Sequence, residues 1–445
     1  MRCLIIDANG NGLDLALRIQ ADGHQVKLFI RQTEKNKHIG RGLIDIPDDY
    51  RPWMRWSNLV ILTDNTYYMR DVDAHRRDGG LVIGATQVTA EWELDREVGQ
   101  KVLRDHGIEV PPYKIFNDYD KAIAHVRKHD KRFVSKPSGD ADKSLSYVAQ
   151  SPADMVYMLE RWKKMSKLKG EFILQEFISG CEMAVGGYFG PAGFQDAWCE
   201  NFEFKKLMNN EMGPATGEQG TVLRFVKKSK LADQMLKPLA EELAKAGHTG
   251  YIDVNCIIDD AGQAWPLEFT TRYGWPTTNI QEALHNGDHA EWLMNLAEGE
   301  KDQPWMMNTV AIGVVLSIPD YPYSHMTRKE VVGVPVYGMK QDLLEHIHPC
   351  EMMMGEAPIQ SSKGIFSIPH MVTAGDYVLV MTANGGSVQE ARETVYRRLN
   401  RLTVPNSPQW RTDIGRRLAK QLPSIQALGY ATGMTYSIMP TSSTA

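Results

Sequence analysis

Short apolar segments alternate with helix-like stretches over the first ninety residues, and this alternation most constrains the fold. The segments 3–7, 26–30, 59–63 and 81–84 are rich in Ile, Leu and Val. Strands that are separated by helices need crossover connections, which favours a mostly parallel sheet. We therefore expect an N-terminal α/β, Rossmann-like domain over residues 1–89, with a ligand site beyond the carboxyl ends of its strands.

Residues 90–302 are predicted to form a second domain that mixes helices and strands. Two strands, a helix and two more strands would make a small α+β lid at about 115–190, in which 183–189 pairs as a hairpin with 172–178. A long helix is expected at 230–246.

A change of composition near residue 302 marks a third predicted domain. The segment 303–432 is rich in strands at first, and the small, polar residues 433–445 are expected to be flexible. A chain of 445 residues accords with about three domains at roughly 150 residues each. The predicted fold class is therefore a multidomain mixture of α/β and α+β units.

Charge and composition exclude several classes of function. Lys and Arg number 50 against 55 Asp and Glu, so the chain lacks the basic excess of a protein that coats nucleic acid. The apolar runs are far shorter than the ~20 residues of a membrane helix. Five cysteines without a Cys-x-x-Cys pattern suggest reduced thiols. We expect a cytoplasmic enzyme for small molecules, with no nucleic-acid polymer or membrane as partner, as a monomer or small homo-oligomer.

Two further motifs are less specific. Gly10, Asn11 and Gly12 follow the first strand, but Leu15 stands where a dinucleotide fingerprint needs its third glycine. The turn still suits an anionic ligand at a helix N-terminus. His346 and His348, with Cys350, have metal-ligand chemistry, but structural zinc usually needs four ligands from two loops. A surface edge of an ordinary sheet is the preferred interpretation.

A predicted hairpin, 251–258 with 264–269, carries the first chemically informative pair. Asn255 and Glu268 could face one side of the sheet, and oxygen ligands of this kind hold Mg²⁺ while leaving sites for phosphate. Arg272 follows and could reach an anionic oxygen. A solvated strand-end acid is the alternative interpretation of Glu268.

Cations and a glycine-rich turn add to this pair. Phosphoryl transfer needs positive groups on the phosphates, and Lys136 and Lys143 border a predicted turn. The strand at 172–178 could bind an adenine edge through its backbone, with Glu182 on the ribose. The segment 213–220, preceded by Lys205, contains more glycine than an ordinary surface loop needs.

The order of these features resembles the ATP-grasp superfamily, and within it the phosphoribosylamine–glycine ligase family. The family's Gly-Pro-Asn-Thr-Gly-Gly-Met-Gly is similar to residues 213–220, and its Ile-Glu-Phe-Asn-x-Arg-Phe-Gly to 267–274. Its Glu-Glu-Phe-Leu-x-Gly-x-Glu is similar to 175–182, and its closing Arg-x-Asp-Ile-Gly to 411–415. The resemblance therefore covers nearly the whole chain in collinear order.

The resemblance implies an ATP-dependent carboxylate–amine ligase that forms ADP and phosphate through an acyl phosphate. It implies a pre-ATP-grasp domain, an ATP-grasp domain and a C-terminal domain, with ATP and Mg²⁺ or Mn²⁺ as cofactors. The substrates would be an amino acid such as glycine, plus an amine. The implied ATP-binding residues are Arg96, Lys136, Gln175, Phe177, Ile178 and Glu182. The implied catalytic residues are Arg272 and Lys143, and the metal ligands Glu268, Asn255 and Thr270. The expected substrate-binding residues are Gly10, Asn11, Gly12, Lys205, Gly213, Pro214, Thr216 and Gly217.

Departures from the family pattern cluster on the acceptor side. Residues 13–15 read Leu-Asp-Leu where the family has Arg-Glu-His, and 63–65 read Thr-Asp-Asn where it has Gly-Pro-Glu. Thr270 replaces a metal-binding Asn, and Trp275 and Thr277 replace an Asp and a Glu. We therefore expect an amine substrate other than phosphoribosylamine. Two alternatives remain: a ligase that attaches an amino acid to another metabolite or modified nucleotide, and a non-catalytic nucleotide-binding relative.

Overall fold

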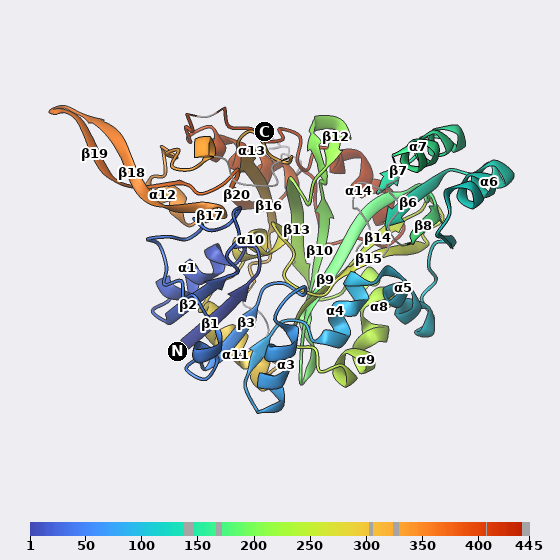
Figure 1. Ribbon diagram of the computed structural model, residues 1–445, viewed down its shortest axis with the longest axis horizontal. Helices are drawn as coiled ribbons and strands as arrows, with labels where there is room; N and C mark the ends of the chain where they lie inside the picture. Colours follow the sequence, from blue (N-terminus) through green and yellow to red (C-terminus); the bar gives the residue numbers. More distant parts are fainter. Residues whose placement is uncertain (138–145, 166–170, 302–305, 324–328, 406, 438–445) are drawn as a thin grey trace, which may run out of the picture.

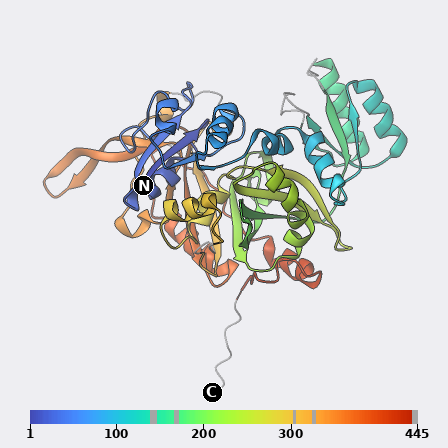
Figure 2. The same cartoon turned by 90° about the horizontal axis from the view of Figure 1, so that it is seen from below.

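The computed structural model describes residues 1–137, 146–165, 171–301, 306–323, 329–405 and 407–437. A large central sheet lies between an N-terminal sheet at one end of the molecule and a small sheet with two helices at the other (Figures 1 and 2). The predicted multidomain fold class is confirmed. The domain boundaries at 89 and 302 stay predictions.

The N-terminal sheet is parallel throughout, as the alternation of strands and helices predicted. Its order is β2-β1-β3-β4. Helices cover it, so its strands are apolar on both faces. The strands are β1 (Arg2–Asp7), β2 (Gln25–Ile30), β3 (Leu59–Leu62) and β4 (Val82–Ile83), and the helices are α1 (Leu13–Ala21), α2 (Arg51–Met54) and α3 (Met69–Arg77).

The small sheet is antiparallel in the order β5-β8-β6-β7 and shares a separate core with α6 and α7. Its elements are β5 (Tyr113–Phe116), α6 (Tyr119–His129), β6 (Phe133–Pro137), β7 (Tyr147–Val148), α7 (Pro152–Lys164) and β8 (Phe172–Glu176). The predicted hairpin between 172–178 and 183–189 is wrong. The next strand, β9 (Cys181–Gly190), leaves this sheet and joins the central one, where β10 and β14 flank it.

The central sheet has eight antiparallel strands in the order β15-β14-β9-β10-β13-β16-β20-β17. These are β10 (Gly193–Glu203), β13 (Gly220–Val226), β14 (Gly250–Ile258), β15 (Ala264–Thr270), β16 (Val310–Ser317), β17 (Ile347–Pro349) and β20 (Tyr377–Gly385), together with β9. The predicted pairing of β14 with β15 is confirmed. The sheet also crosses the boundary predicted near 302, because β13 pairs with β16.

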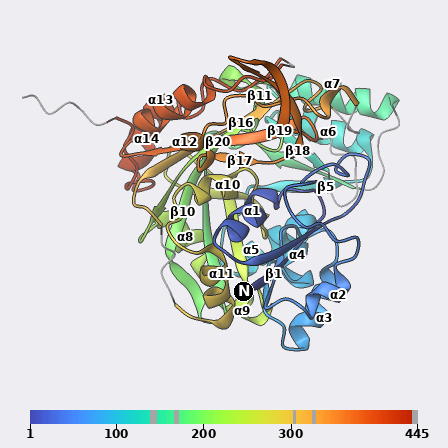
Figure 3. The same cartoon turned by 90° about the vertical axis from the view of Figure 1, so that its left-hand side faces the viewer.

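Alternate residues of β16 pack against different helices. Val310 and Ile312 share a core with α13 (Val388–Leu399), whereas Ala311 and Val315 share one with Ile280 of α10 (Thr277–Glu282). This alternation follows from the two-residue period of a strand. α10 therefore lies on the same face as the N-terminal domain, and Figure 3 shows α1 close to it.

The remaining α-helices of the described residues are α4 (Gln87–Leu94), α5 (Arg96–Asp105), α8 (Lys230–Met235), α9 (Ala240–Lys245), α11 (His289–Glu298), α12 (Gln341–Leu344) and α14 (Leu418–Ala427). Among them, α8 and α11 pack against β9, and α9 against β10, all on interior strands of the central sheet. The long helix predicted at 230–246 is wrong, because a 3₁₀ turn at Lys237–Leu239 separates α8 from α9. Pro238 lacks the backbone N–H that a continuous helix would need there.

Two hairpins extend from the body. The ribbon of β18 (Met352–Ser361) and β19 (Gly364–Thr373) projects from the body on the side where the N-terminal domain lies (Figure 1). The shorter pair, β11 (Lys206–Met208) and β12 (Met212–Ala215), follows β10. Within the described residues, no helix has the length and apolar character that crossing a bilayer demands.

The predicted flexible tail is partly held. Thr435 and Tyr436 accept hydrogen bonds from the first turn of α13, at N···O distances of 2.9 and 2.8 Å. The side chain of Met434 is buried. Residues 438–445 lie outside the described residues.

A buried polar network joins the N-terminal domain to the central sheet. Asp14 of α1 lies 2.7 Å from His348 Nδ1 on the edge strand β17, and it accepts a hydrogen bond from Asn279 of α10. Burial opposes the ionisation of Asp14, but Arg18 and His348 lower its pKa below the ordinary value. His348, which the sequence offered as a possible metal ligand, therefore bonds to a residue of another domain. Its edge strand, β17, is buried and does not lie on the surface.

Replacing Asp14 by Ala should lower the free energy of unfolding by about 3–5 kcal/mol, because it leaves buried partners uncompensated. Urea denaturation would measure the change. The matched control is Asp49→Ala, which removes an exposed carboxylate from the same domain. Equal stability of the two variants would contradict the importance of this network.

Candidate active site

The centre of the candidate site is Glu268 on β15. The backbone register pairs Glu268 with Asn255 of β14, so the two residues are direct neighbours, as predicted. Asn255 Nδ2 donates to Glu203 Oε2 on β10 at 2.9 Å. Asn255 Oδ1 is buried, and among the described residues it has no hydrogen-bond partner. Thr270 lies two residues beyond Glu268 on the same strand.

Lys205 holds three carboxylates of this site together. Its Nζ lies 2.9 Å from Glu182, 3.0 Å from Glu203 and 3.4 Å from Glu268. Burial would lower the pKa of Lys205, but the surrounding carboxylates raise it well above the ordinary value. The ammonium group is therefore charged at neutral pH. Lys205, predicted to bind substrate, lies within the carboxylate cluster.

Two further cations face Glu268. Arg96 donates to Glu268 Oε2 at 3.0 Å and to the carbonyl oxygen of Leu267. Lys136 is on β6, in the small sheet. Burial would raise the pKa of Glu268, but Lys205, Arg96 and Lys136 lower it below the ordinary range. Burial, followed by Arg96, lowers the pKa of Lys136 to about 7. The site therefore brings three basic groups to one ionised carboxylate.

The predicted adenine strand lies beside this cluster. Gln175 is buried on β8, and the backbone N–H of Phe177 donates to the carbonyl oxygen of Arg132 at 2.9 Å. The Arg132 guanidinium also lies 3.5 Å from the centre of the Phe177 ring. Ile178 follows in the segment that leads to β9. The roles of these residues in adenine binding stay predictions, and Lys143 lies outside the described residues.

Arg272 has a partner that the sequence did not indicate. Its guanidinium lies 2.9 Å from Glu93 Oε1, and Glu93 Oε2 accepts from the Thr271 backbone and from Asn65. Glu93 thereby joins α4, the N-terminal domain and the end of β15. The predicted catalytic role of Arg272 stays a prediction.

The N-terminal turn satisfies its own amide groups. Asp7 Oδ1 accepts from the backbone N–H groups of Asn9 and Gly10 at 2.7 and 2.8 Å, and Oδ2 accepts from Gly12. Burial raises the pKa of Asp7 to about 6. The turn at Gly10, Asn11 and Gly12 therefore already contains an acidic group where an anionic ligand was expected. This arrangement disfavours phosphate at these amides.

The glycine-rich turn is tied to Lys205. The backbone N–H and hydroxyl of Thr216 both donate to the Lys205 carbonyl oxygen, each at 2.8 Å. Gly213 and Pro214 belong to β12, and Gly213 has a positive φ that favours glycine. A side chain at Gly217 would meet open space. The turn thus borders the carboxylate cluster, although its predicted substrate contacts stay predictions.

Sequence reasoning missed three acids near this turn. Glu203 lies in the cluster, Asp253 accepts hydrogen bonds from Asn201 and Tyr251, and Glu218 accepts from Thr277. Burial, then Glu203, raises the pKa of Asp253 to about 7 and that of Glu218 well above its ordinary value. Asn201 and Glu203, spaced two residues apart so that they share one strand face, were the available signal for β10. The contact with β14 could not be read from it, because β9 lies between these strands.

The donor set fits a divalent cation. Glu268 and Glu203 offer carboxylate oxygens, and Asn255 Oδ1 is an orphaned buried acceptor beside them. Mg²⁺ prefers such oxygen ligands and retains positions for phosphate oxygens. The nearby positive groups can neutralise phosphate charge. This constellation can support phosphoryl transfer to a carboxylate.

Comparisons with known proteins agree with this geometry. The family model described as "Phosphoribosylglycinamide synthetase, ATP-grasp (A) domain" matches residues 95–278. A curated phosphoribosylamine–glycine ligase from Streptococcus pneumoniae is 24% identical over 360 residues, which cover 78% of this chain and 81% of the relative. The sequence resemblance to these ATP-grasp ligases is confirmed.

Solved structures share the fold. Phosphoribosylamine–glycine ligase from Thermotoga maritima has a TM-score of 0.70 at 16% identity, covering 93% of this chain and 100% of the other. The biotin carboxylase domain of 2-oxoglutarate carboxylase from Hydrogenobacter thermophilus has a TM-score of 0.59 at 11% identity, covering 98% and 96%. The latter structure contains magnesium ADP and bicarbonate.

Lys136 should react with an amine-acylating reagent at unusually low pH. Its pKa of about 7 leaves half of the side chain neutral at that pH, whereas an ordinary lysine titrates near 10.4. Peptide mass spectrometry across pH 5–10 would give the midpoint, with an unfolded peptide of the same segment as control. Magnesium ADP should suppress the labelling. A midpoint near that of the control peptide would contradict the assigned environment.

Proposed function

We propose that this chain, an ATP-grasp enzyme of the ligase class, joins a carboxylate such as glycine to an amine other than phosphoribosylamine. The observation that carries the proposal is the convergence of Arg96, Lys136 and Lys205 on the carboxylate of Glu268. An ionised carboxylate among cations suits a metal-bound nucleotide. The similarity to phosphoribosylamine–glycine ligases supports the reaction class.

In the proposed reaction, Lys136 and Arg96 bind the phosphates of ATP. Glu268 and Asn255 would hold Mg²⁺, which would neutralise phosphate charge; Mn²⁺ has similar ligand preferences. The substrate carboxylate attacks the γ-phosphorus to give ADP and an acyl phosphate, and the amine then displaces phosphate. The incoming ammonium releases a proton to solvent before its nitrogen attacks the acyl phosphate.

The changed amine is supported by the N-terminal turn. Asp7 occupies the amides of Asn9, Gly10 and Gly12, and Asp64 accepts a hydrogen bond from the backbone of Ala8. Two acids in the turn repel a phosphate. An unphosphorylated amine avoids this repulsion, and a small molecule of this kind is the proposed second substrate.

The cytoplasm is the proposed location. All five cysteines, at positions 3, 181, 199, 256 and 350, are buried free thiols. Reduced thiols accord with a reducing compartment. The biosynthetic ligases to which the chain is similar support the same proposal.

Replacing Glu268 by Gln should reduce magnesium-dependent ATP cleavage by on the order of 10²–10³-fold, as expected for loss of a group that stabilises transition-state charge. ADP release with glycine and a panel of amines, including phosphoribosylamine, would measure it. The control is Glu160→Gln, an exposed site on α7.

Three outcomes would count against parts of this proposal. Full activity of the Glu268 variant would refute the assigned role of that carboxylate. Efficient turnover of phosphoribosylamine by the unchanged chain would refute the changed amine. ATP binding without cleavage, whatever the amine, would favour the non-catalytic alternative.

A further inference from the structure

A cavity of about 370 Å³ lies beside the glycine-rich turn. Its walls come from the β11–β12 hairpin, the start of β13 and the segment before the Arg-x-Asp motif. Four apolar side chains and three amides predominate: Leu207, Met208, Met212 and Trp410, with Asn209, Gln219 and Gln409. A volume of this size suits a small-molecule ligand or one part of it.

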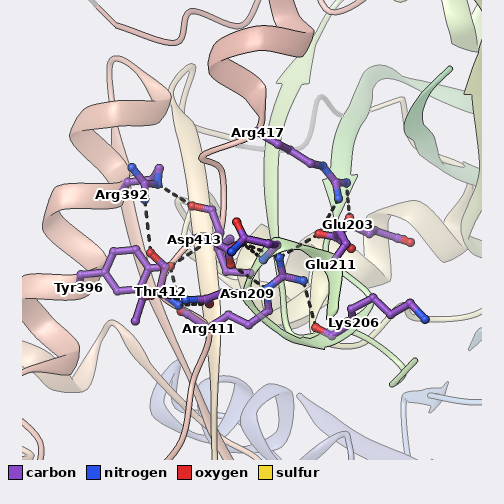
Figure 4. Close-up of polar contacts among 12 residues, drawn as sticks. Glu203, Lys206, Asn209, Glu211, Arg392, Tyr396, Arg411, Thr412, Asp413 and Arg417 are labelled. Atoms are coloured by element: carbon purple, nitrogen blue, oxygen red, sulfur yellow. Dashed lines mark hydrogen bonds and ion pairs between the residues drawn. The ribbon is translucent and has the colours of Figure 1, made fainter. Parts of the chain in front are cut away.

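The cation in the lining is already neutralised. Arg411 is 1% exposed, and its guanidinium lies 2.8 Å from Asp413 Oδ1 and 2.9 Å from Glu211 Oε1. It also donates to the carbonyl oxygen of Lys206 at 3.0 Å. Figure 4 shows Arg411 between these partners. A phosphate in the cavity would lack an available cation among the described lining residues, so the lining favours an uncharged group.

The same contacts make the wall rigid. Arg417 bonds to Glu211 and to the backbone oxygen of Glu203, which ties the hairpin to the carboxylate cluster (Figure 4). Tyr396 donates to the carbonyl oxygen of Arg411 at 3.0 Å. The Arg-x-Asp motif that resembled a family signature thus anchors the cavity wall to α13.

Hydrogen-bond acceptors remain in the lining. Gln219 Nε2 donates to the Tyr321 hydroxyl at 3.1 Å, and Gln409 Nε2 donates to the Tyr321 carbonyl at 3.2 Å. These bonds fix both amides through their nitrogen atoms. Within the described residues, no hydrogen bond is donated to the side-chain oxygen of Gln219 or of Gln409. Both oxygens can therefore accept a hydrogen bond from a ligand.

A short chain of contacts joins the cavity to the site of ATP chemistry. Gln219 Nε2 donates to Thr216 Oγ1 at 3.1 Å, and that hydroxyl donates to the Lys205 carbonyl oxygen. Lys205 in turn contacts Glu268. A ligand in the cavity therefore lies next to the turn that borders the proposed reaction centre.

We propose that this cavity binds the ring of the amine substrate, a primary amine carried on an uncharged aromatic ring. The inference rests on the proposed function. Trp410 offers an aromatic face, the thioethers of Met208 and Met212 cover apolar surface, and the amide oxygens accept N–H groups. In the reaction, the deprotonated amine nitrogen forms the C–N bond as the acyl C–O bond to phosphate breaks. Inorganic phosphate leaves, and the second amine proton passes to water.

Fluorine NMR with 4-fluorobenzylamine tests the cavity directly. We expect line broadening with the full chain and magnesium ADP, and none with 2-fluoroethylamine, which carries the same charge without a ring. Replacing Trp410 by Ala should weaken 4-fluorobenzylamine binding about tenfold, because ring–ring contact is lost. Met212→Lys should weaken it similarly, since it places a cation at the cavity against the ammonium.

The matched control is Met165→Lys. Met165 is 51% exposed and Met212 57% exposed, so both variants add the same charge to a surface methionine without disturbing the core. Met165 follows α7, outside the cavity lining. Equal binding by all variants, or no binding by the unchanged chain, would overturn the inference.

Hydroxylamine separates failure of the inference from failure of the proposed function. It is a small nucleophile that intercepts acyl phosphates and needs no ring pocket, so glycine hydroxamate and ADP should form if the ligase chemistry is right. Hydroxamate without binding of 4-fluorobenzylamine would overturn only the cavity assignment. Absence of hydroxamate with any amino acid tried would overturn both.

Discussion

The candidate site depends on compensation of charge around Lys205. Glu182, Glu203 and Glu268 come from β9, β10 and β15, and each would repel the others without the ammonium between them. The side chains of Glu182 and Glu268 are 34% and 42% exposed, so solvent screens only part of this repulsion. Lys205 therefore does more than occupy a substrate loop. It allows three strands to present acids on one side of the sheet.

Sheet order explains which part of this cluster could be inferred from sequence. Asn255 and Glu268 belong to one local hairpin, so their proximity follows from a short turn and the two-residue period. Glu203 reaches Asn255 across β9, a strand that sequence reasoning assigned to the wrong sheet. Alternation can indicate a strand, but it does not identify its neighbours. Arg96 was found only through resemblance to a family, whereas Lys136 was first noted as a cation that borders a predicted turn.

The departures on the acceptor side acquire structural roles. Asp14 bonds to His348 and Asn279, Asp64 accepts from the N-terminal turn, and Asn65 donates to Glu93. Family comparison located these positions but could not assign their partners, because those of Asp14 and Asn65 lie outside the N-terminal domain. Glu218 is a similar case: it replaces a family glycine and is buried beside Thr277. Residues that differ from the family thus form hydrogen bonds within and between domains.

The pairing of β13 with β16 has a consequence for dissecting the molecule. A fragment that stops near residue 302 would lose β16, β20 and β17 together, since these form one end of the central sheet. The backbone N–H and C=O groups of β13 that pair with β16 would then have no partner. Unpaired groups along a strand edge form hydrogen bonds with strands of other chains. A fragment that ends near residue 302 would therefore yield self-associating material, because the strands that carry the candidate site share one sheet with the carboxyl-terminal third of the polypeptide.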